Sequence, residues 1–148
     1  MKKILLLVFF IAIVGVFPVL AQKKIIRTTD APLPIAPYSQ GVVANGFLFV
    51  AGQVGLNPQT RQLVPGGFEQ ETTQIMDNIK AILKAAGVDL SHVVNTTIYL
   101  KDISNFAKVN EIYGQYFTGD FPARTTVGVA NLPGGASIEI AVVAVMKK

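Results

Sequence analysis

The sequence has no cysteine and only one histidine in 148 residues. The lack of cysteine excludes disulfide bonds, thiolate metal sites and a cysteine nucleophile. The single histidine, His92, leaves few ways to build a histidine metal site or a Ser-His-Asp triad. The chemistry of the protein must therefore rest on other side chains, and we expect no bound metal.

Charged residues are also few, at 15% of the chain against 51% hydrophobic residues. The formal net charge is +4, of which Lys2 and Lys3 supply two, and the remainder has no basic cluster. A nucleic-acid partner is therefore not expected. The length and apolar content suit one domain with a real core and are too small for two typical domains.

The first 21 residues have the order of a secretory signal peptide. Two lysines precede an uncharged apolar run at residues 4–17, and Pro18 and Ala21 follow it. The run is shorter than the roughly 20 residues that span a bilayer, so we favour a cleaved signal over the alternative of a membrane anchor. Cleavage before Gln22 would leave residues 22–148 as one exported domain, periplasmic or secreted, with no stable membrane insertion.

Local turn signals divide the rest of the chain. Residues 31–40 hold three prolines and predict extended backbone along the surface. Asn45-Gly46 separates two apolar runs, and this residue pair favours a tight hairpin turn. We therefore expect a β-hairpin around it.

Two stretches have helical periodicity. Residues 68–86 place one apolar face at helical spacing, and Gly87 is suited to end this helix. That face comprises Thr72, Ile75, Met76, Ile79, Ile82, Leu83 and Ala86. Ser104 is the expected cap of a second helix, and Asn110 lies on its apolar stripe. The stripe consists of Phe106, Val109, Tyr113 and Phe117.

Strand-like residues fill the ranges 92–100, 125–131 and 136–146. The order hairpin, helix, strand, helix, two strands predicts an α+β domain with two helices on one face of a mixed sheet. The last strand is apolar on both sides, with Ile138, Ile140, Val142, Ala144 and Met146 on one and Ala136, Ala141, Val143 and Val145 on the other. Because two helices cover only one side, we expect an oligomer to bury the other.

Arg124 and Glu139 place full charges within these apolar runs. Burying either charge costs several kcal/mol unless it is paired or hydrogen-bonded. In one interpretation the two form a structural ion pair with each other. In the other they line a pocket, where Arg124 binds a ligand carboxylate and Glu139 orients or activates water.

Five short stretches carry a family resemblance: Tyr38 in "APYSQG", Gly52 and Gln53 in "VAGQVG", Asn110 in "FAKVN", Arg124 in "FPARTTV" and Glu139 in "IEIAVVAV". They resemble the reactive intermediate deaminases, the RidA (YjgF-type) family, over almost all of the chain beyond the leader. The resemblance implies a chorismate-mutase-like α+β fold, a homotrimer with sites at the subunit interfaces, and no cofactor. The implied activity is hydrolysis of 2-imino acids, of the 2-iminobutanoate and 2-iminopropanoate type, or of their enamine tautomers, to 2-oxo acids and ammonia.

The resemblance also implies roles for individual residues. Arg124 and Glu139 would be catalytic, and the substrate would contact Tyr38, Gly52, Gln53, Asn110, Arg124 and Thr126. Family members often have serine where this chain has Ala51, and cysteine where it has Thr126, whose hydroxyl can still form a hydrogen bond. A purely structural role for Tyr38 stays open. Two functions without turnover also stay open, namely a small-carboxylate binding module and a chaperone-like trimer outside the cytoplasm.

Overall fold

The computed structural model describes residues 23–147. Six strands form one sheet in the order β1-β2-β3-β6-β4-β5. The strands are β1 (Lys24–Ile26), β2 (Gly41–Ala44), β3 (Phe47–Gln53), β4 (Val93–Leu100), β5 (Ala123–Gly128) and β6 (Ile138–Val145). The β4–β5 pair is parallel and the other pairs are antiparallel, so the sheet is mixed.

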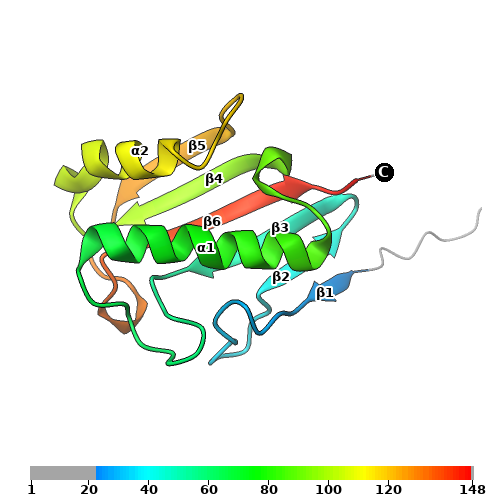
Figure 1. Ribbon diagram of the computed structural model, residues 1–148, viewed down its shortest axis with the longest axis horizontal. Coiled ribbons are helices and arrows are strands. Elements are labelled where there is room, and N and C mark those ends of the chain that lie inside the picture. Colours follow the sequence, from blue (N-terminus) through cyan, green and yellow to red (C-terminus); the bar gives the residue numbers. More distant parts are fainter. Residues whose placement is uncertain (1–22, 148) are drawn as a thin grey trace, which may run out of the picture.

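Both long helices, α1 (Phe68–Ala86) and α2 (Phe106–Gly114), lie on the same face of this sheet (Figure 1). The longer α1 crosses the middle of the sheet, and α2 covers the end that carries β4 and β5. The predicted α+β class, with two helices on one face of a mixed sheet, is confirmed. We call the sheet face beneath the helices the helix face and the opposite one the open face.

The predicted hairpin and first helix follow from local sequence. Asn45 and Gly46 have φ angles of 49° and 79°, the left-handed values that a two-residue hairpin turn requires. Helix α1 buries the predicted stripe in the core and ends at Gly87, which has φ 86° and donates its N–H to the last carbonyls.

The second helix begins differently from the prediction. Ser104 does not cap it: the N-cap of α2 is Asn105, whose side chain forms no capping hydrogen bond. A short 3-10 turn, Ile103–Asn105, leads into α2, and Asp102 caps this turn, because its carboxylate accepts the Ser104 N–H at 2.9 Å. Helix α2 then ends at Gly114, and Phe117 lies beyond it, with its ring 4.7 Å from that of Tyr113.

The last strand alternates as predicted. The residues Ile138, Ile140, Val142 and Ala144 are buried under the helices, while Glu139, Ala141, Val143 and Val145 are half-buried on the open face. Phe47 and Phe49 of β3 lie opposite Val145 and Val143, so they extend the apolar open face. Ala136 departs from the prediction: it precedes β6 at the end of a 3-10 turn and is fully buried.

The predicted signal peptide, residues 1–21, and its cleavage point before Gln22 lie outside the described residues. Among residues 23–147, no helix combines the length and the apolar character needed to cross a bilayer.

Candidate functional site

Arg124 lies on edge strand β5 and points to the helix face. Its partner in register on β4 is Thr96, whose hydroxyl contacts the buried Tyr113 hydroxyl of α2 at 2.9 Å. The Arg124 Nη2 donates to Asn110 Oδ1 at 2.5 Å, and its guanidinium carbon is 5.1 Å from the Tyr113 ring centroid. An amide acceptor and an aromatic ring thus hold the cation in place without neutralising it.

A cavity of about 420 Å³ opens beside this guanidinium. It is lined by Asn110, Tyr113, Gly114, Phe121, Pro122 and Arg124. In the described part of the chain, no ion pair involves Arg124. The cavity therefore offers a planar, charged donor to a ligand carboxylate, beside apolar walls that suit a small side chain.

Glu139 lies on β6 and points to the open face. Its partner on β4 is Tyr99, and its neighbours along the strand, Ile138 and Ile140, point the other way. Burial raises the pKa of the Glu139 carboxyl above its ordinary value of 4.5. Its carboxylate takes no hydrogen bond from any described residue, so it is available to a water molecule or a substrate.

The approach of β3 to Glu139 depends on Gly52, because a Cβ atom at residue 52 would collide with the Glu139 carboxylate. Between Val50 and Gln53 the pairing of β3 with β6 gains one residue, which is a β-bulge. The buried Gln53 side chain donates from Nε2 to the Ala51 carbonyl at 2.9 Å. In this chain Gln53 therefore stabilises the bulge on which Gly52 lies.

The predicted site residues thus form two groups. Arg124 and Asn110 are together on the helix face, and Glu139, Gly52 and the bulge are together at the open face. The ion pair between Arg124 and Glu139, one of the two interpretations of the sequence, is not formed. The pocket that contains both residues is also not formed within one protomer, because β5 and β6, which lie on either side of β4, present them to opposite faces.

Among the described residues, neither Tyr38 nor Thr126 forms a side-chain hydrogen bond with Arg124 or Glu139. Tyr38 lies in the segment between β1 and β2, and its side chain is 48% exposed. Thr126 follows Arg124 by two residues on β5 and shares its face. The Thr126 hydroxyl is buried and has no hydrogen-bond partner among the described residues, so it can still bond to a ligand or to water.

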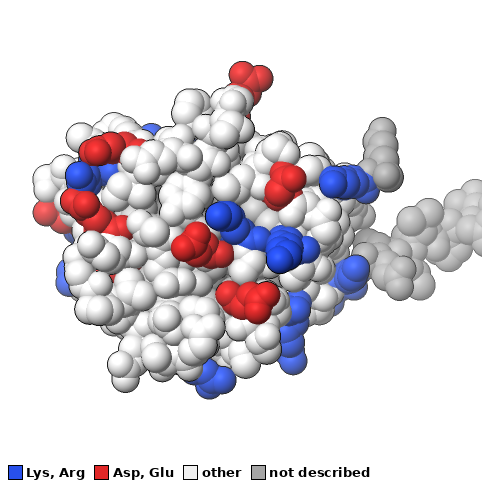
Figure 2. Space-filling model, viewed as in Figure 1, with Lys and Arg blue, Asp and Glu red and all other residues white. Residues whose placement is uncertain are grey.

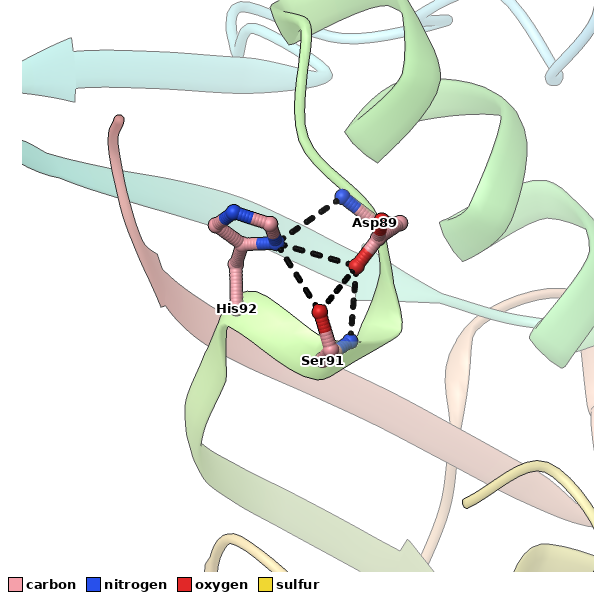
Figure 3. A network of polar contacts seen from close by, with 3 residues as sticks. All are labelled: Asp89, Ser91 and His92. Carbon is pink, nitrogen blue, oxygen red and sulfur yellow. Dashed lines mark hydrogen bonds and ion pairs between the residues drawn. The ribbon is translucent and has the colours of Figure 1, made fainter. Parts of the chain in front are cut away.

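His92 belongs to a separate polar cluster (Figure 3). Its Nδ1 is 2.9 Å from Asp89 Oδ1 and 3.2 Å from Ser91 Oγ. Because serine and aspartate approach the same ring nitrogen, the imidazole cannot relay a proton between them as in a catalytic triad. The cluster is the capping box of the 3-10 turn Leu90–His92.

The charges on the visible surface do not form a basic patch. Blue and red side chains alternate over the face that carries α1 (Figure 2). Within residues 23–147, no group of three His, Asp or Glu side chains is arranged to hold a metal ion. The two groups around Arg124 and Glu139 are therefore the strongest candidates for chemistry.

Two features of the site were not predicted from the sequence. The first is the aromatic setting of Arg124: Tyr113 and Phe106 were assigned only to the core stripe, yet both rings lie within 6 Å of the guanidinium carbon. Their spacing of three and four residues from Asn110 was the available signal. The second is Glu71, a buried carboxylate of α1 that bonds to Ser137, two residues before Glu139. The local pattern gave no signal for this contact.

Comparison with known proteins places this chain in one family. The family model described as Endoribonuclease L-PSP matches residues 28–146. The mouse protein named 2-iminobutanoate/2-iminopropanoate deaminase is 50% identical over 123 residues, covering 83% of this chain and 91% of the mouse protein. A RutC family protein of Pyrococcus horikoshii is 48% identical over 123 residues, covering 83% of this chain and 98% of its own length.

Solved structures agree with the sequence relatives. The crystal structure of RidA from an Antarctic Psychrobacter has a TM-score of 0.80 at 37% identity, covering 83% of this chain and 99% of that one. Escherichia coli TdcF, crystallised with bound serine, has a TM-score of 0.80 at 36% identity, covering 84% and 99%. The chain therefore belongs to the endoribonuclease L-PSP family, which is the RidA (YjgF-type) family that its sequence resembles.

Proposed function

We propose that the protein hydrolyses 2-imino acids, of the 2-iminobutanoate and 2-iminopropanoate type, and their enamine tautomers to 2-oxo acids and ammonia. The observation that carries this proposal is the Arg124 guanidinium, held by the neutral Asn110 amide beside a cavity with no described carboxylate as its partner. Such a cation recognises a planar carboxylate through two parallel hydrogen bonds. The names of relatives about 50% identical to this chain support the same reaction class.

The reaction needs a water molecule and one group that carries protons. With the substrate carboxylate on Arg124, water adds to the electrophilic C2 carbon, and the C=N bond becomes a C–N single bond. Glu139 takes a proton from the water and returns it to the nitrogen, after which the carbinolamine forms C=O and releases ammonia. Burial raises the pKa of the Glu139 carboxyl, so it holds a proton at higher pH than an exposed glutamate and is better suited to act as an acid as well as a base.

We propose further that the active site forms between protomers of a homotrimer. Because Arg124 and Glu139 of one chain point to opposite faces, a substrate that contacts both must take one of them from a neighbouring chain. Two different surfaces of the protomer then meet, and three such contacts close a ring when each rotates the chain by a third of a turn. The apolar open face with Phe47 and Phe49 is the surface that this assembly would cover.

The direct test is the decay of a 2-imino acid, trapped with semicarbazide, in the presence and absence of the protein from residue 22 onward. Arg124→Lys keeps the charge but loses the two-pronged geometry, so turnover should fall about ten- to a hundred-fold, or roughly 1.5–3 kcal/mol. Arg27→Lys, at an exposed arginine, is the matched control and should retain wild-type turnover. Undiminished turnover by a folded Arg124→Lys protein would contradict the role of Arg124.

The same protein preparations separate the two alternatives without turnover. A carboxylate-binding module would bind a 2-oxo acid, lose that binding in Arg124→Ala, and leave the imine unchanged. A chaperone-like trimer would suppress aggregation of another protein equally well with and without Arg124. Only an enzyme loses imine hydrolysis in this variant.

We also propose that the protein acts outside the cytoplasm. The support is the order of charged, apolar and small residues in positions 1–21. Mass spectrometry of the N-terminus of the protein from its native cell should find Gln22 or a close neighbour as the first residue. An uncleaved chain in the cytoplasm would overturn this proposal.

A further inference from the structure

Glu71 is a buried carboxylate that the proposed reaction does not use. It lies in the first turn of α1 and is 5% exposed. Both of its carboxylate oxygens accept hydrogen bonds from Ser137. Its Oε2 accepts the backbone N–H of Ser137 at 2.8 Å, and its Oε1 accepts the Ser137 hydroxyl at 3.0 Å. Hydrogen bonds to an ionised acceptor are stronger than neutral ones, so this contact ties the start of α1 firmly to residue 137.

Ser137 is the residue immediately before β6, and its carbonyl accepts the Lys101 N–H at 3.0 Å. Every polar group of Ser137 is therefore hydrogen-bonded: its N–H and hydroxyl to Glu71, and its carbonyl to Lys101, the residue after β4. The chain just before it turns through Gly134 and Gly135, which have φ angles of 64° and 76°. Glycines leave this turn weakly restrained, so the start of β6 is fixed by the hydrogen bond from Lys101 on the β4 side and by the two hydrogen bonds to Glu71 on the α1 side.

Gly52 of β3 and Gly55 just after it allow the chain to pass close to the two glutamates. A Cβ atom at residue 55 would lie 2.6 Å from the Glu71 Cα, and a Cβ at residue 52 would collide with the Glu139 carboxylate. The short stretch from Gly52 to Gly55 therefore passes close to both glutamates. Glu71 in turn binds Ser137, which is two residues from Glu139, so this stretch lies against both ends of the link from Glu71 to Glu139.

We infer that Glu71 is a positioning residue for Glu139. Its carboxylate fixes Ser137 and thereby the position at which β6 begins. The position of β6 in turn determines where the Glu139 carboxylate lies relative to Gly52 on the open face. The catalytic part of this inference rests on the proposed function of Glu139. The structural part does not, because the position and protonation of the Glu139 carboxylate can be measured without any substrate.

If Glu71 positions Glu139, its loss should lower kcat and leave KM almost unchanged. Displacing a proton carrier by about 1 Å can cost up to a hundred-fold in rate, whereas carboxylate binding depends on Arg124. Glu71→Ala should lower kcat by about tenfold or more and leave KM within about twofold. Glu71→Gln, which keeps the shape and one acceptor oxygen, should recover most of the loss. Equal kcat in wild type and a folded Glu71→Ala protein would overturn the inference.

The matched control is Glu69→Ala. Glu69 lies in the same first turn of α1, but it is exposed and pairs with Lys108 at 3.3 Å. This variant should keep the wild-type kcat and KM. A loss of kcat equal to that of Glu71→Ala would assign the effect to the helix end as a whole and would overturn the inference.

A measurement without substrate uses the small number of glutamates, which are Glu69, Glu71, Glu111 and Glu139. Protein labelled with 13C at the glutamate carboxyl gives one signal for each, and Glu139→Gln identifies the signal of interest. Burial raises the Glu139 pKa in the wild type, and Tyr99 across β4 is the titratable group that faces it. In Glu71→Ala the Glu139 signal should titrate closer to its ordinary pKa, because the carboxylate gains water.

The outcomes separate the two proposals. A shifted Glu139 titration in a protein that hydrolyses no imine supports the positioning role and contradicts the proposed function. An unchanged titration and chemical shift in folded Glu71→Ala overturn the positioning role, whatever the activity. If Glu71→Ala fails to fold, Ser137→Ala removes only the hydroxyl donor and should displace the same signal by a smaller amount; no displacement there overturns the inference.

Discussion

At the scale of single residues, Gly52 determines whether Glu139 can keep its position. We predict that Gly52→Ala lowers imine hydrolysis at least tenfold while the melting temperature changes little. The three atoms nearest to the added Cβ are Oε1, Cδ and Cγ of the Glu139 side chain, which can rotate away, so the backbone keeps its place and the carboxylate is displaced. Turnover and thermal melts on the same preparation check this, and full activity in a folded Gly52→Ala protein would contradict it.

Gly55 gives the contrasting result because its neighbour is backbone. A Cβ at residue 55 would lie 2.6 Å from the Glu71 Cα, which cannot move without shifting α1. We predict that Gly55→Ala destabilises the protein by about 1–3 kcal/mol, the usual cost of overpacking. Urea unfolding should detect the loss; a midpoint equal to that of the wild type would show that α1 moves more freely than this contact indicates.

Glu139 should also lower stability at neutral pH. Burial raises its pKa, so the folded state favours the protonated form and is penalised when the carboxyl ionises. The protonated Glu139 carboxyl therefore contributes stability below pH 4.5, its ordinary pKa, and this contribution is lost as the pH rises through the raised pKa of the folded state. We predict that Glu139→Gln abolishes turnover yet melts at a higher temperature than wild type at pH 8, with the difference vanishing below pH 4. A variant less stable at pH 8 would contradict this.

At the scale of elements, the connection from α1 to β4 carries its own acid-sensitive contact. Hydrogen bonds from Ser91 and then His92 lower the pKa of Asp89 from 3.8 to about 2. The stability that Asp89 provides is present above its ordinary pKa and is lost as pH falls through the lowered one. Asp89→Asn should flatten the fall in melting temperature between pH 4 and pH 2. Asp120→Asn, at an exposed carboxylate outside this cluster, should leave that slope unchanged.

Elements were predictable where local chemistry determines them. Asn45-Gly46 and Gly87 have the left-handed backbone that their sequence positions indicated, and the alternation of β6 follows from its apolar residues. The start of α2 was predicted wrongly because a 3-10 turn capped by Asp102 precedes the helix, and α2 itself has no side-chain cap. The chain is already turning when α2 begins, so no capping residue marks its first residue in the sequence.

The site was less predictable than the elements, since its geometry depends on which sheet face each residue reaches. The sequence indicated Arg124 and Glu139 as unusual charges, but their separation follows from the register of β5 and β6 against β4. The contact of Glu71 with Ser137 joins residues 66 positions apart and has no local signature. Long-range register is fixed by the packing of the whole sheet, and periodicity does not encode it.

At the scale of the whole molecule, the open face is the surface that the α1 and α2 layer leaves uncovered. Phe47 and Phe49 are 41% and 49% exposed there, beside the apolar half of β6. A contiguous apolar sheet face of this kind favours association. It also carries Glu139, so assembly and chemistry should depend on the same surface.

We predict that Phe49→Glu yields a folded monomer without imine hydrolysis, whereas the wild type is a trimer. The new carboxylate would lie among apolar side chains at the interface, and burying an unpaired charge there costs several kcal/mol. This cost is larger than the contact between two protomers can offset. Ala85→Glu adds the same charge to the exposed side of α1 and should leave both the trimer and its activity intact. Light scattering at micromolar concentration and the semicarbazide assay measure the two properties together. A monomer of the wild type or of Phe49→Glu that hydrolyses imines would refute a site shared between chains, because a single protomer presents Arg124 and Glu139 to opposite faces of its sheet.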